Sequence, residues 1–389
     1  SLTGTAAGAF DTKNFGTGKT VTITGLSLTG TDAGNYTLNT YTTTANITQK
    51  ALDISGLTAA NKTYDGNTTA SLSGTAVLTG SSTAANDGRY IGSESVSLTG
   101  TAAGAFDTKN FGTGKTVTIT GLSLTGTDAG NYTLNTYTRT ADIDKRSVTL
   151  TAPSVTKAYD GLTTYMVTAG NLTSIGSTLV GGDTVTAATI TYSSKNVGSG
   201  DRTVTLSGVT ISDGNSGNNY TVTLAGNSSS TITRQTSVTW IGGSTGDWFN
   251  PANWAVTGTS TPGAVPDLAN VSAVVIGAGK TVTFDDSVSG RTSPASTGLV
   301  EITTLSGGGS LTVTNGSISA TSLNVVQLNT SSGTTITTSS GITVAPATGT
   351  TDTIAGVLEG NGTLTKNGTG TTVLTGANTY TGATTIGAG

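Results

Sequence analysis

Residues 97–138 read SLTGTAAGAFDTKNFGTGKTVTITGLSLTGTDAGNYTLNTYT, and residues 1–42 carry the same letters without a change. Within this stretch Val117 and Ile119 alternate with threonine, and the alternation slips by one residue at Gly121. Alternation of apolar and polar residues predicts a strand with one buried face, as in an antiparallel sheet. A phase slip at a glycine inside a strand predicts a β-bulge or a bend. The repeated stretch therefore predicts the bent strands of a β-sandwich.

A third, more divergent copy keeps the same landmarks in the same order. The matching segments are KTYDGNTT at 62–69 and KAYDGLTT at 157–164, KNFGTGKTVTITG at 109–121 and KNVGSGDRTVTLSG at 195–208, and AGNYTL at 129–134 and GNNYTVTL at 217–224. A unit of about 90 residues is long enough for one immunoglobulin-like sandwich. We therefore expect residues 1–48 to be the C-terminal half of a repeat, residues 49–144 a complete repeat, and residues 145–234 a divergent repeat.

Residues 235–389 follow a different pattern. Beyond Pro262, short apolar triplets such as LTV at 311–313 and ITV at 342–344 are separated by glycine, asparagine and serine. Regular short strands with small turn residues predict a parallel β-solenoid. The expected fold class is all-β: tandem immunoglobulin-like β-sandwich repeats, followed by a Trp-rich junction and a parallel β-solenoid (β-helix).

The three tryptophans of the chain, Trp240, Trp248 and Trp254, lie together in WIGGSTGDWFNPANW at residues 240–254. They could form a sugar-binding surface. Clustered tryptophans in a glycine-rich region more often fill a core, and this stretch must cap the first coil of the solenoid. A junction core is therefore the favoured interpretation.

The composition removes several kinds of chemistry. The chain has 389 residues, no Cys and no His, and only 10% of its residues are charged. Without Cys or His there is no thiol nucleophile, no Ser-His-Asp triad and no zinc site of the usual ligands. The net charge of −4 argues against a nucleic-acid partner, and no apolar stretch approaches the roughly 18 residues of a membrane span. We therefore expect no catalytic residue, no cofactor and no metal.

The Lys-x-Tyr-Asp-Gly turn, the Lys-Asn-x-Gly-x-Gly segment and the Ala-Gly-Asn-Tyr ending resemble the YDG (MBG-type) repeats of bacterial surface adhesins and filamentous-haemagglutinin-like exoproteins, over roughly residues 1–234. The last segment, GVLEGNGTLTKNGTGTTVLTGANTYTGATTIGAG at 356–389, resembles the passenger-associated transport repeat of autotransporters. These resemblances imply an extracellular stalk of sandwiches and a secreted solenoid, and they carry over no enzymatic residue. Two-partner secretion and autotransport both use such modules.

The most regular landmark is the Lys-x-Tyr-Asp-Gly turn. Its residues are Lys62, Tyr64, Asp65 and Gly66 in one copy and Lys157, Tyr159, Asp160 and Gly161 in the other. In a functional interpretation the Asp binds calcium or the Tyr is a platform for carbohydrate. The favoured interpretation is structural: the Asp accepts backbone N–H groups, the Gly supplies a positive φ, and the Tyr packs on the sandwich with the Lys across it. An isopeptide cross-link between Lys62 and a strand Asn is a further alternative.

Two acidic segments also have a functional and a structural interpretation. The loop at 213–219 is similar in composition to a calcium loop but lacks the acidic twelfth position, so a turn is favoured. Asp285 and Asp286 are similar to the paired acids of polysaccharide-cleaving β-helices. Such sites usually need further charged partners, and only Arg291 is near in sequence.

Together these features predict a structural and adhesive segment of a large secreted or surface-anchored bacterial fibre, acting through many weak contacts in cell adhesion, aggregation or biofilm. The expected partners are neighbouring repeats or identical chains, and host or bacterial surface glycans or proteins. The expected location is extracellular or at the outer-membrane surface. One alternative is a self-assembling filament or matrix subunit completed by β-strand donation. A second is a β-helix glycan-active enzyme.

Residues 1–48 carry an expectation of their own. The sequence starts without Met and in the middle of a repeat, which indicates a piece of a longer chain. This half repeat lacks a YDG turn, so we expect Val21, Ile23, Leu26 and Leu28 to form an exposed apolar face. We expect the half repeat to be ordered only when upstream sequence or a strand from another chain completes it.

Overall fold

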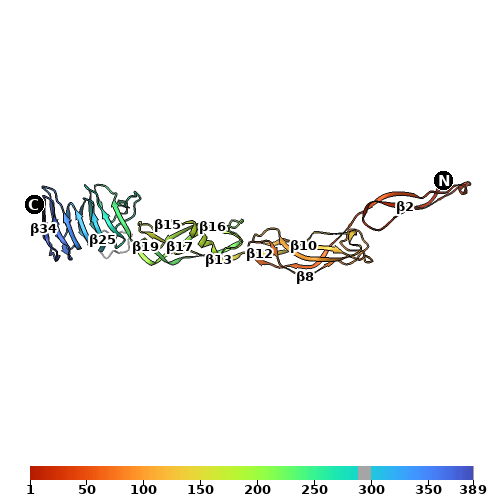
Figure 1. The fold of residues 1–389 in the computed structure, drawn as a ribbon, viewed down its shortest axis with the longest axis horizontal. Coiled ribbons are helices and arrows are strands. Elements are labelled where there is room, and N and C mark those ends of the chain that lie inside the picture. The colour runs from red at the N-terminus through yellow and green to blue at the C-terminus, as the bar shows by residue number, and fades with distance from the viewer. Residues whose placement is uncertain (288–298, 389) are drawn as a thin grey trace. The chain divides into compact units, whose positions relative to one another are not determined.

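The computed structural model describes residues 1–287 and 299–388. Most of the regular structure in these residues is β-strand (Figure 1), and they include one short α-helix, α1 (Ala169–Ile175). The predicted all-β class, with repeats followed by a solenoid-like segment, is therefore confirmed. The chain divides into two compact units. Unit 1 consists of Ser1–Val148, Leu179–Asp183 and Ile211–Val222, and unit 2 consists of Thr149–Thr178, Thr184–Thr210 and Thr223–Gly389.

The complete second repeat is a sandwich of a five-stranded sheet and an antiparallel pair. The sheet has the order β6 (Lys62–Thr63), β12 (Tyr137–Asp144), β10 (Gly112–Thr125), β9 (Ser97–Phe106) and β7 (Thr69–Ala70). The pair is β5 (Ile54–Ala59) and β8 (Leu72–Leu78). Ile54 and Leu57 of the pair pack against Ile119 and Tyr137 of the sheet. Each fully buried side chain of this kind contributes about 1.5–3 kcal/mol, and this cluster is the core of the repeat.

The bend predicted at the repeated glycine is present. The register of β9 and β10 shifts between Thr120 and Leu122, where Gly121 has φ of 84°. A Cβ at Gly121 would lie 2.2 Å from the carbonyl oxygen of Thr101. Glycine is therefore required here both for its positive φ and for the close approach of the two strands.

In the second repeat, two of the described strand pairings differ from the antiparallel expectation. β6 pairs in parallel with β12, and β4 (Lys50–Leu52) pairs in parallel with β11 (Tyr132–Leu134). Each pairing covers only two or three residues, which is too short for an alternating pattern to appear. Parallel partners are also joined by long crossovers, so nothing local in the sequence marks them.

Residues 1–48 form the antiparallel sheet β1 (Leu2–Phe10), β2 (Gly16–Leu28) and β3 (Tyr41–Ile47). Of the expected apolar face, Val21 is buried and the other three residues are half-buried. The side chains that stay exposed are larger ones: Phe10 is 42% exposed and Tyr41 is 66% exposed. Their identical counterparts in the second repeat, Phe106 and Tyr137, are 3% and 7% exposed. Burial therefore depends on what covers the sheet, since the local sequence is the same.

The two identical stretches allow a matched test of this difference. We expect Ile119→Val to lower the free energy of unfolding of the second repeat by about 1 kcal/mol, because Ile119 lies in a packed core. Ile23→Val, in the same local sequence but half-buried, should cost clearly less. Hydrogen exchange resolved to each repeat measures both values. Equal costs would contradict the difference in packing.

Unit 2 contains the remaining sandwich strands and the solenoid. The third repeat has a sheet of the order β14 (Thr156–Ala158), β19 (Asn227–Thr233), β17 (Gly198–Ser212), β16 (Thr184–Tyr192) and β15 (Thr164–Tyr165), most of which lies in unit 2. Strands β13 (Arg146–Thr151) and β18 (Tyr220–Ala225) have residues in both units. The Thr168 side chain and Asn171 form a capping box at the start of α1.

Two sheets build the solenoid, and successive coils add parallel strands to each. The strand at the start of the first sheet is antiparallel to its neighbour. The first sheet follows β22 (Trp254–Val256), β20 (Gln235–Trp240), β23 (Val271–Val275), β25 (Leu299–Ser306), β27 (Ser317–Val325), β29 (Thr335–Val344), β32 (Thr363–Lys366) and β34 (Thr384–Ile386), with β31 (Val357–Glu359) also on β29. The second follows β21 (Thr245–Asp247), β24 (Thr281–Asp285), β26 (Ser310–Asn315), β28 (Leu328–Thr330), β30 (Thr351–Ile354) and β33 (Thr371–Leu374). Val300, Ile318, Ile336 and Leu358 stack in register as one buried ladder. Stacked coils thus share a continuous core.

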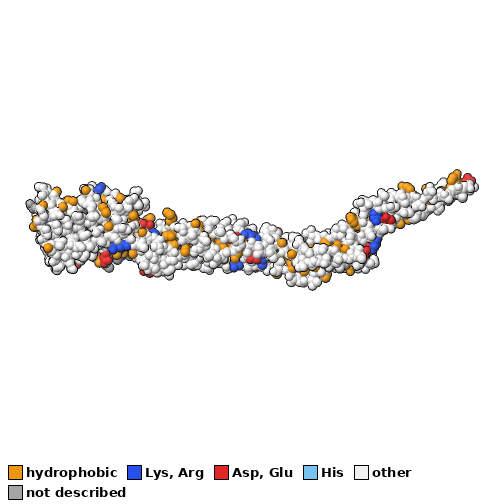
Figure 2. Space-filling view, viewed as in Figure 1, with side chains coloured by type: hydrophobic (Ala, Val, Ile, Leu, Met, Phe, Trp, Pro, Cys, Tyr) orange, Lys and Arg blue, Asp and Glu red, His pale blue; other side chains and the backbone are white. Residues whose placement is uncertain are grey.

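Charged side chains are sparse on the surface. Figure 2 shows a face that is mostly uncharged, with small groups of acidic and basic side chains. In residues 1–287 and 299–388, no helix is long and apolar enough to cross a membrane.

Candidate functional site

The two Lys-x-Tyr-Asp-Gly turns are held by the same internal contacts. Lys62 Nζ donates to Asp65 Oδ1 at 2.7 Å and to the carbonyl oxygens of Asn67 and Thr69 at 2.8 and 3.0 Å. The Asn67 N–H donates to Asp65 Oδ1 at 3.1 Å, and Gly66 has φ of 84°. Burial alone would raise the pKa of Asp65, but Lys62 and this N–H hold it below the ordinary value. The Lys62 ammonium group therefore stabilises its own turn through these contacts.

The second turn repeats this arrangement in unit 2. Lys157 Nζ lies 2.7 Å from both Asp160 Oδ1 and the Leu162 carbonyl oxygen. The Leu162 N–H donates to Asp160 Oδ1 at 2.9 Å, and Gly161 has φ of 80°. Because each Asp accepts from the Lys and from a turn N–H, neither turn presents a cluster of acidic oxygens for a cation.

The lysine that faces the first turn's tyrosine is not the one expected. Lys62 lies over the ring of Phe106, 5.5 Å from its centroid, and Lys157 lies 5.7 Å over Tyr192. The ammonium group over Tyr64 belongs to Lys109, at 5.7 Å. The expected Lys62–Tyr64 arrangement is wrong because Lys62 Nζ is engaged by the carbonyl groups of its own turn.

The hydroxyl of Tyr64 leaves its own turn and reaches the tip of the third repeat, which lies in the same compact unit. The ring is fully buried, and its hydroxyl donates to Asp183 Oδ2 at 2.8 Å. Tyr220 donates to the same oxygen at 2.7 Å, and Lys109 Nζ is 3.1 Å from Asp183 Oδ1. The Asp183 side chain is only 3% exposed. Burial raises the pKa of both Tyr64 and Tyr220, so both stay neutral donors.

The Lys-Asn loop that follows β9 makes a second contact with the same tip. The Phe111 N–H donates to Asn219 Oδ1 at 2.9 Å. Asn219 Nδ2 donates to Asn110 Oδ1 at 3.3 Å. One asparagine amide thus satisfies both a backbone donor and a side-chain acceptor of the loop.

The Lys-Asn loop of residues 1–48 meets the second repeat in the same way. The Phe15 N–H donates to Asn131 Oδ1 at 2.9 Å, and Asn131 Nδ2 donates to Asn14 Oδ1 at 3.3 Å. Lys13 Nζ lies 2.9 Å from Glu94 Oε1, whose side chain is 5% exposed. The contact is therefore a recurring feature of successive repeats.

In unit 2 the third repeat makes this contact with the loop before β23. Tyr159 is fully buried, and its hydroxyl lies 2.8 Å from the Val265 carbonyl oxygen and 3.2 Å from Asp267 Oδ1. Lys195 Nζ is 3.1 Å from Asp267 Oδ2. The Val197 N–H donates to Asn270 Oδ1 at 2.8 Å. Burial raises the pKa of Tyr159, and the Asp267 carboxylate raises it further.

The glycine of each turn lies against backbone of the following segment. A Cβ at Gly66 would lie 2.4 Å from the Cα of Gly181, and a Cβ at Gly161 would lie 1.9 Å from the carbonyl oxygen of Gly263. These distances leave no room for a side chain. We use the word joint for the set of contacts that a YDG turn and the Lys-Asn loop make with the next acidic residue and asparagine.

In the structure Lys62 and Lys157 lie in the strands β6 and β14, and the Tyr-Asp-Gly residues of each turn follow these strands. The sequence interpretation assigned no partner to these turns. Asp183, Asn219, Asp267 and Asn270 had no assigned role. A signal existed for Asn219, because it lies in the GNNY landmark that recurs with GNY at Asn131. Asp267 and Asn270 lie in a loop without periodicity, and only the structure brings them to the turn.

The three tryptophans lie in the interior at the start of the solenoid. Trp248 and Trp254 are fully buried and Trp240 is 5% exposed. Trp254 packs edge-on against Trp240 and Trp248, with ring centroids 5.1 and 5.2 Å apart. Their buried faces are not available to a sugar, so this arrangement suits the junction-core interpretation.

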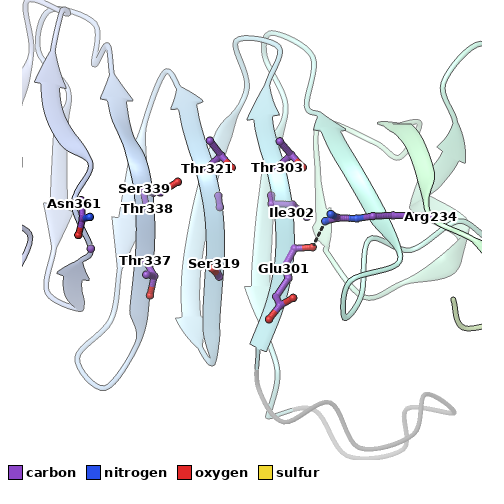
Figure 3. A pocket seen from close by; sticks show the side chains of 12 residues that line it. Arg234, Glu301, Ile302, Thr303, Ser319, Thr321, Thr337, Thr338, Ser339 and Asn361 are labelled. Carbon is purple, nitrogen blue, oxygen red and sulfur yellow. Dashed lines mark hydrogen bonds between the residues drawn. The ribbon is translucent and has the colours of Figure 1, made fainter. Parts of the chain in front are cut away.

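A shallow groove of about 500 Å³ crosses one face of the solenoid (Figure 3). Arg234 Nη2 donates to the Glu301 and Val271 carbonyl oxygens. Arg234 lines the groove, and the other lining residues are chiefly ones with hydroxyl or amide side chains: Thr303, Ser319, Thr321, Thr337, Thr338, Ser339 and Asn361. The Thr337 hydroxyl donates to Glu359 Oε1 at 2.7 Å, so that carboxylate is engaged. The groove has no aromatic platform among these residues.

The first acidic segment is a turn, and in the second Asp285 ends β24 and Asp286 begins the turn that follows. Asp213 is buried and accepts the N–H groups of Asn215, Gly217 and Asn219. Asp285 accepts from the N–H and hydroxyl of Ser287. Arg291 lies outside the described residues. Within the described part of the chain, no group of three or more Asp or Glu residues is placed to hold a metal ion.

Comparison with known families gives two matches. The YDG domain family model matches residues 1–45, 48–141 and 144–231, and the passenger-associated-transport-repeat model matches residues 364–389. Searches among curated proteins and among solved structures found no match. Both matched repeats are typical of surface or secreted repeat proteins. Because the three YDG matches cover more than half of its residues, the chain belongs to the YDG domain family.

Proposed function

We propose that this chain is a non-enzymatic, adhesive segment of a large bacterial fibre that lies outside the cell. The recurring joint is the observation that carries the proposal. The backbone N–H groups of Phe15, Phe111 and Val197 each donate to an asparagine side chain of the following module. The last of these modules is a solenoid that contains a passenger-associated repeat. Repeats coupled in series provide length, and many weak contacts along that length provide avidity. Host or bacterial surface glycans or proteins would be the partners.

Attachment of coated beads tests this proposal. Beads that carry the full chain at increasing density are incubated with bacterial cells, host-type epithelial cells and immobilised glycans, beside beads that carry an unrelated all-β protein. We expect attachment that rises more steeply than density, because simultaneous weak contacts multiply. Attachment equal to that of the unrelated protein on all three surfaces would contradict an adhesive role.

A filament subunit is the second candidate, and one observation favours it. Phe10 and Tyr41 of the first sheet are 42% and 66% exposed, whereas such side chains are normally covered in a sandwich. Sedimentation of the native chain at rising concentration distinguishes the two roles: defined polymers favour the filament, and a constant monomer favours the adhesin. A variant with Phe10→Ser and Tyr41→Ser is the control, since it should lose any assembly that uses this face. The glycan-active enzyme has no such observation in its favour.

A further inference from the structure

We infer that the YDG turn and the Lys-Asn loop form a coupling surface that recognises a carboxylate and an asparagine amide, whatever fold presents them. The turn and loop of one repeat are called the donor end. The carboxylate and amide of the next module are called the acceptor face. In this chain the solenoid supplies an acceptor face although it is not a YDG repeat. This inference goes beyond the proposed function, because it assigns a partner to a specific surface.

The polar contacts at the two complete joints correspond group by group. Lys109 lies 3.1 Å from Asp183, and Lys195 lies 3.1 Å from Asp267. The amide of Asn219 accepts an N–H and donates to Asn110, at 2.9 and 3.3 Å. The amide of Asn270 does the same to Val197 and Asn196, at 2.8 and 3.0 Å. The tyrosine hydroxyl of each turn reaches the same carboxylate.

The two acceptor faces are built from unlike pieces of backbone. In unit 1, Asp183 precedes β16 and Asn219 precedes β18, on two separate segments. In unit 2, Asp267 and Asn270 lie on one short loop before β23 of the solenoid, and Asn270 Nδ2 also donates to Asp267 Oδ1. Since the donor end is common and the acceptor scaffolds differ, the shared chemistry is what the donor end recognises.

The chain also continues from both acceptor faces in the same way. The Arg146 N–H donates to the Asn219 carbonyl oxygen at 2.9 Å, and the Gln235 N–H donates to the Asn270 carbonyl oxygen at 2.9 Å. The side chain of each asparagine therefore binds the donor end. Its backbone carbonyl oxygen binds the first strand of its own module. This places the amide at a fixed position relative to the incoming repeat.

Burial explains why the recognition is selective. The side chains of Asp183 and Asp267 are each 3% exposed. Each carboxylate has one donor in its own module, Tyr220 for Asp183 and Asn270 for Asp267. A buried negative charge also needs an opposite charge nearby, and the Lys of the donor end supplies it at both joints. The close approach of Gly66 to Gly181 and of Gly161 to Gly263 adds a steric condition. A module that lacks the carboxylate, the asparagine amide or the glycine at the close approach would not bind the donor end.

Hydrogen exchange of single amides in the full chain tests the inference. Asn270→Ala removes the acceptor of the Val197 N–H, and we expect this amide to exchange about tenfold faster or more. Asn219→Ala should accelerate Phe111 instead and leave Val197 unchanged. Unchanged exchange of Val197 in Asn270→Ala, with the solenoid folded, would overturn the acceptor role of Asn270.

A deletion variant tests whether the two acceptor faces are interchangeable. Removal of residues 145–233 joins Asp144 to Arg234 and brings the donor end of the second repeat to the solenoid. We expect the Phe111 amide to remain protected, and we expect Asn270→Ala in this background to remove that protection. A folded deletion variant whose Phe111 amide is unprotected, or protected independently of Asn270, would contradict recognition by chemistry alone. If the deletion variant does not fold, the single-amide test in the full chain still decides the acceptor role.

Discussion

Trp254→Ala lowers the free energy of unfolding of the solenoid by about 4 kcal/mol, the loss typical of truncating a buried tryptophan. Trp254 is fully buried, and its ring contacts those of Trp240 and Trp248. Its indole N–H also donates to the Trp248 carbonyl oxygen at 2.5 Å. The substitution therefore removes packing and leaves a buried acceptor without a donor. The substitution should therefore destabilise the first coil of the solenoid.

Urea unfolding followed by the fluorescence of the two remaining tryptophans measures this effect. Ile241→Ala is the control, because Ile241 is 39% exposed and directly follows β20, the strand that pairs with the strand of Trp254. We expect the control to change the midpoint little. An unchanged midpoint in Trp254→Ala would show that the ring is not part of a core.

Asp352→Asn removes a pH dependence of about 3 kcal/mol from the stability of the solenoid. Asp352 is fully buried on β30, and neither of its carboxylate oxygens accepts a well-formed hydrogen bond from the described residues. Burial raises its pKa to about 6, and the nearby Leu328 backbone and Lys366 ammonium offset only part of the shift. A raised pKa of about two units corresponds to about 3 kcal/mol.

The direction follows from the protonation states. Between about pH 4 and 6 the folded solenoid holds the proton of Asp352 while the unfolded chain has released it. The stabilisation is therefore fully present below pH 4 and is lost as the pH rises through 6. Urea midpoints from pH 4 to 7 should fall in the native chain and fall less in Asp352→Asn. Asp352→Leu is a second variant without an ionisable group, and its urea midpoint should likewise fall less than that of the native chain. A leucine suits this position because Leu328, on the neighbouring strand β28, is also fully buried.

Asp213→Asn tests the direction of the effect in another part of the chain, because Asp213 lies in the third repeat, in unit 1, and its pH dependence has the opposite sign. Burial alone would raise the pKa of Asp213, but three backbone N–H groups hold it below the ordinary value. Its contribution to stability is present at neutral pH and is lost as the pH falls. A native chain whose solenoid has the same midpoint at pH 4 and pH 7 would contradict the burial of an ionisable Asp352.

The strands and their bends could be predicted from the sequence, whereas the joints could not. Val117, Ile119 and Gly121 show alternation and a slip within one segment, so local pattern was sufficient. The partners of Tyr64 and Tyr159 lie more than a hundred residues away, at Asp183 and Asp267. A single sequence carries no local signal for such a contact.

The inward position of Asp352 is visible in the sequence pattern. In the stretch TDTI at 351–354, alternation places Asp352 on the same side as Ile354, which is buried. The pattern thus predicts an inward carboxylate. Short triplets separated by glycine are too short to fix which side of each coil faces inward, so the pattern alone does not single out Asp352 among the coils.

A double-mutant cycle between Tyr159 and Asp267 tests the joint most directly. Tyr159→Phe, Asp267→Asn and the double variant are unfolded in urea with tryptophan fluorescence as the readout, since all three tryptophans lie at the solenoid start in the same unit. If the YDG tyrosine holds the next module through this carboxylate, the coupling free energy is about 1 kcal/mol or more. Costs that add to within about 0.3–0.5 kcal/mol would show that the two side chains act independently, and would contradict the joint.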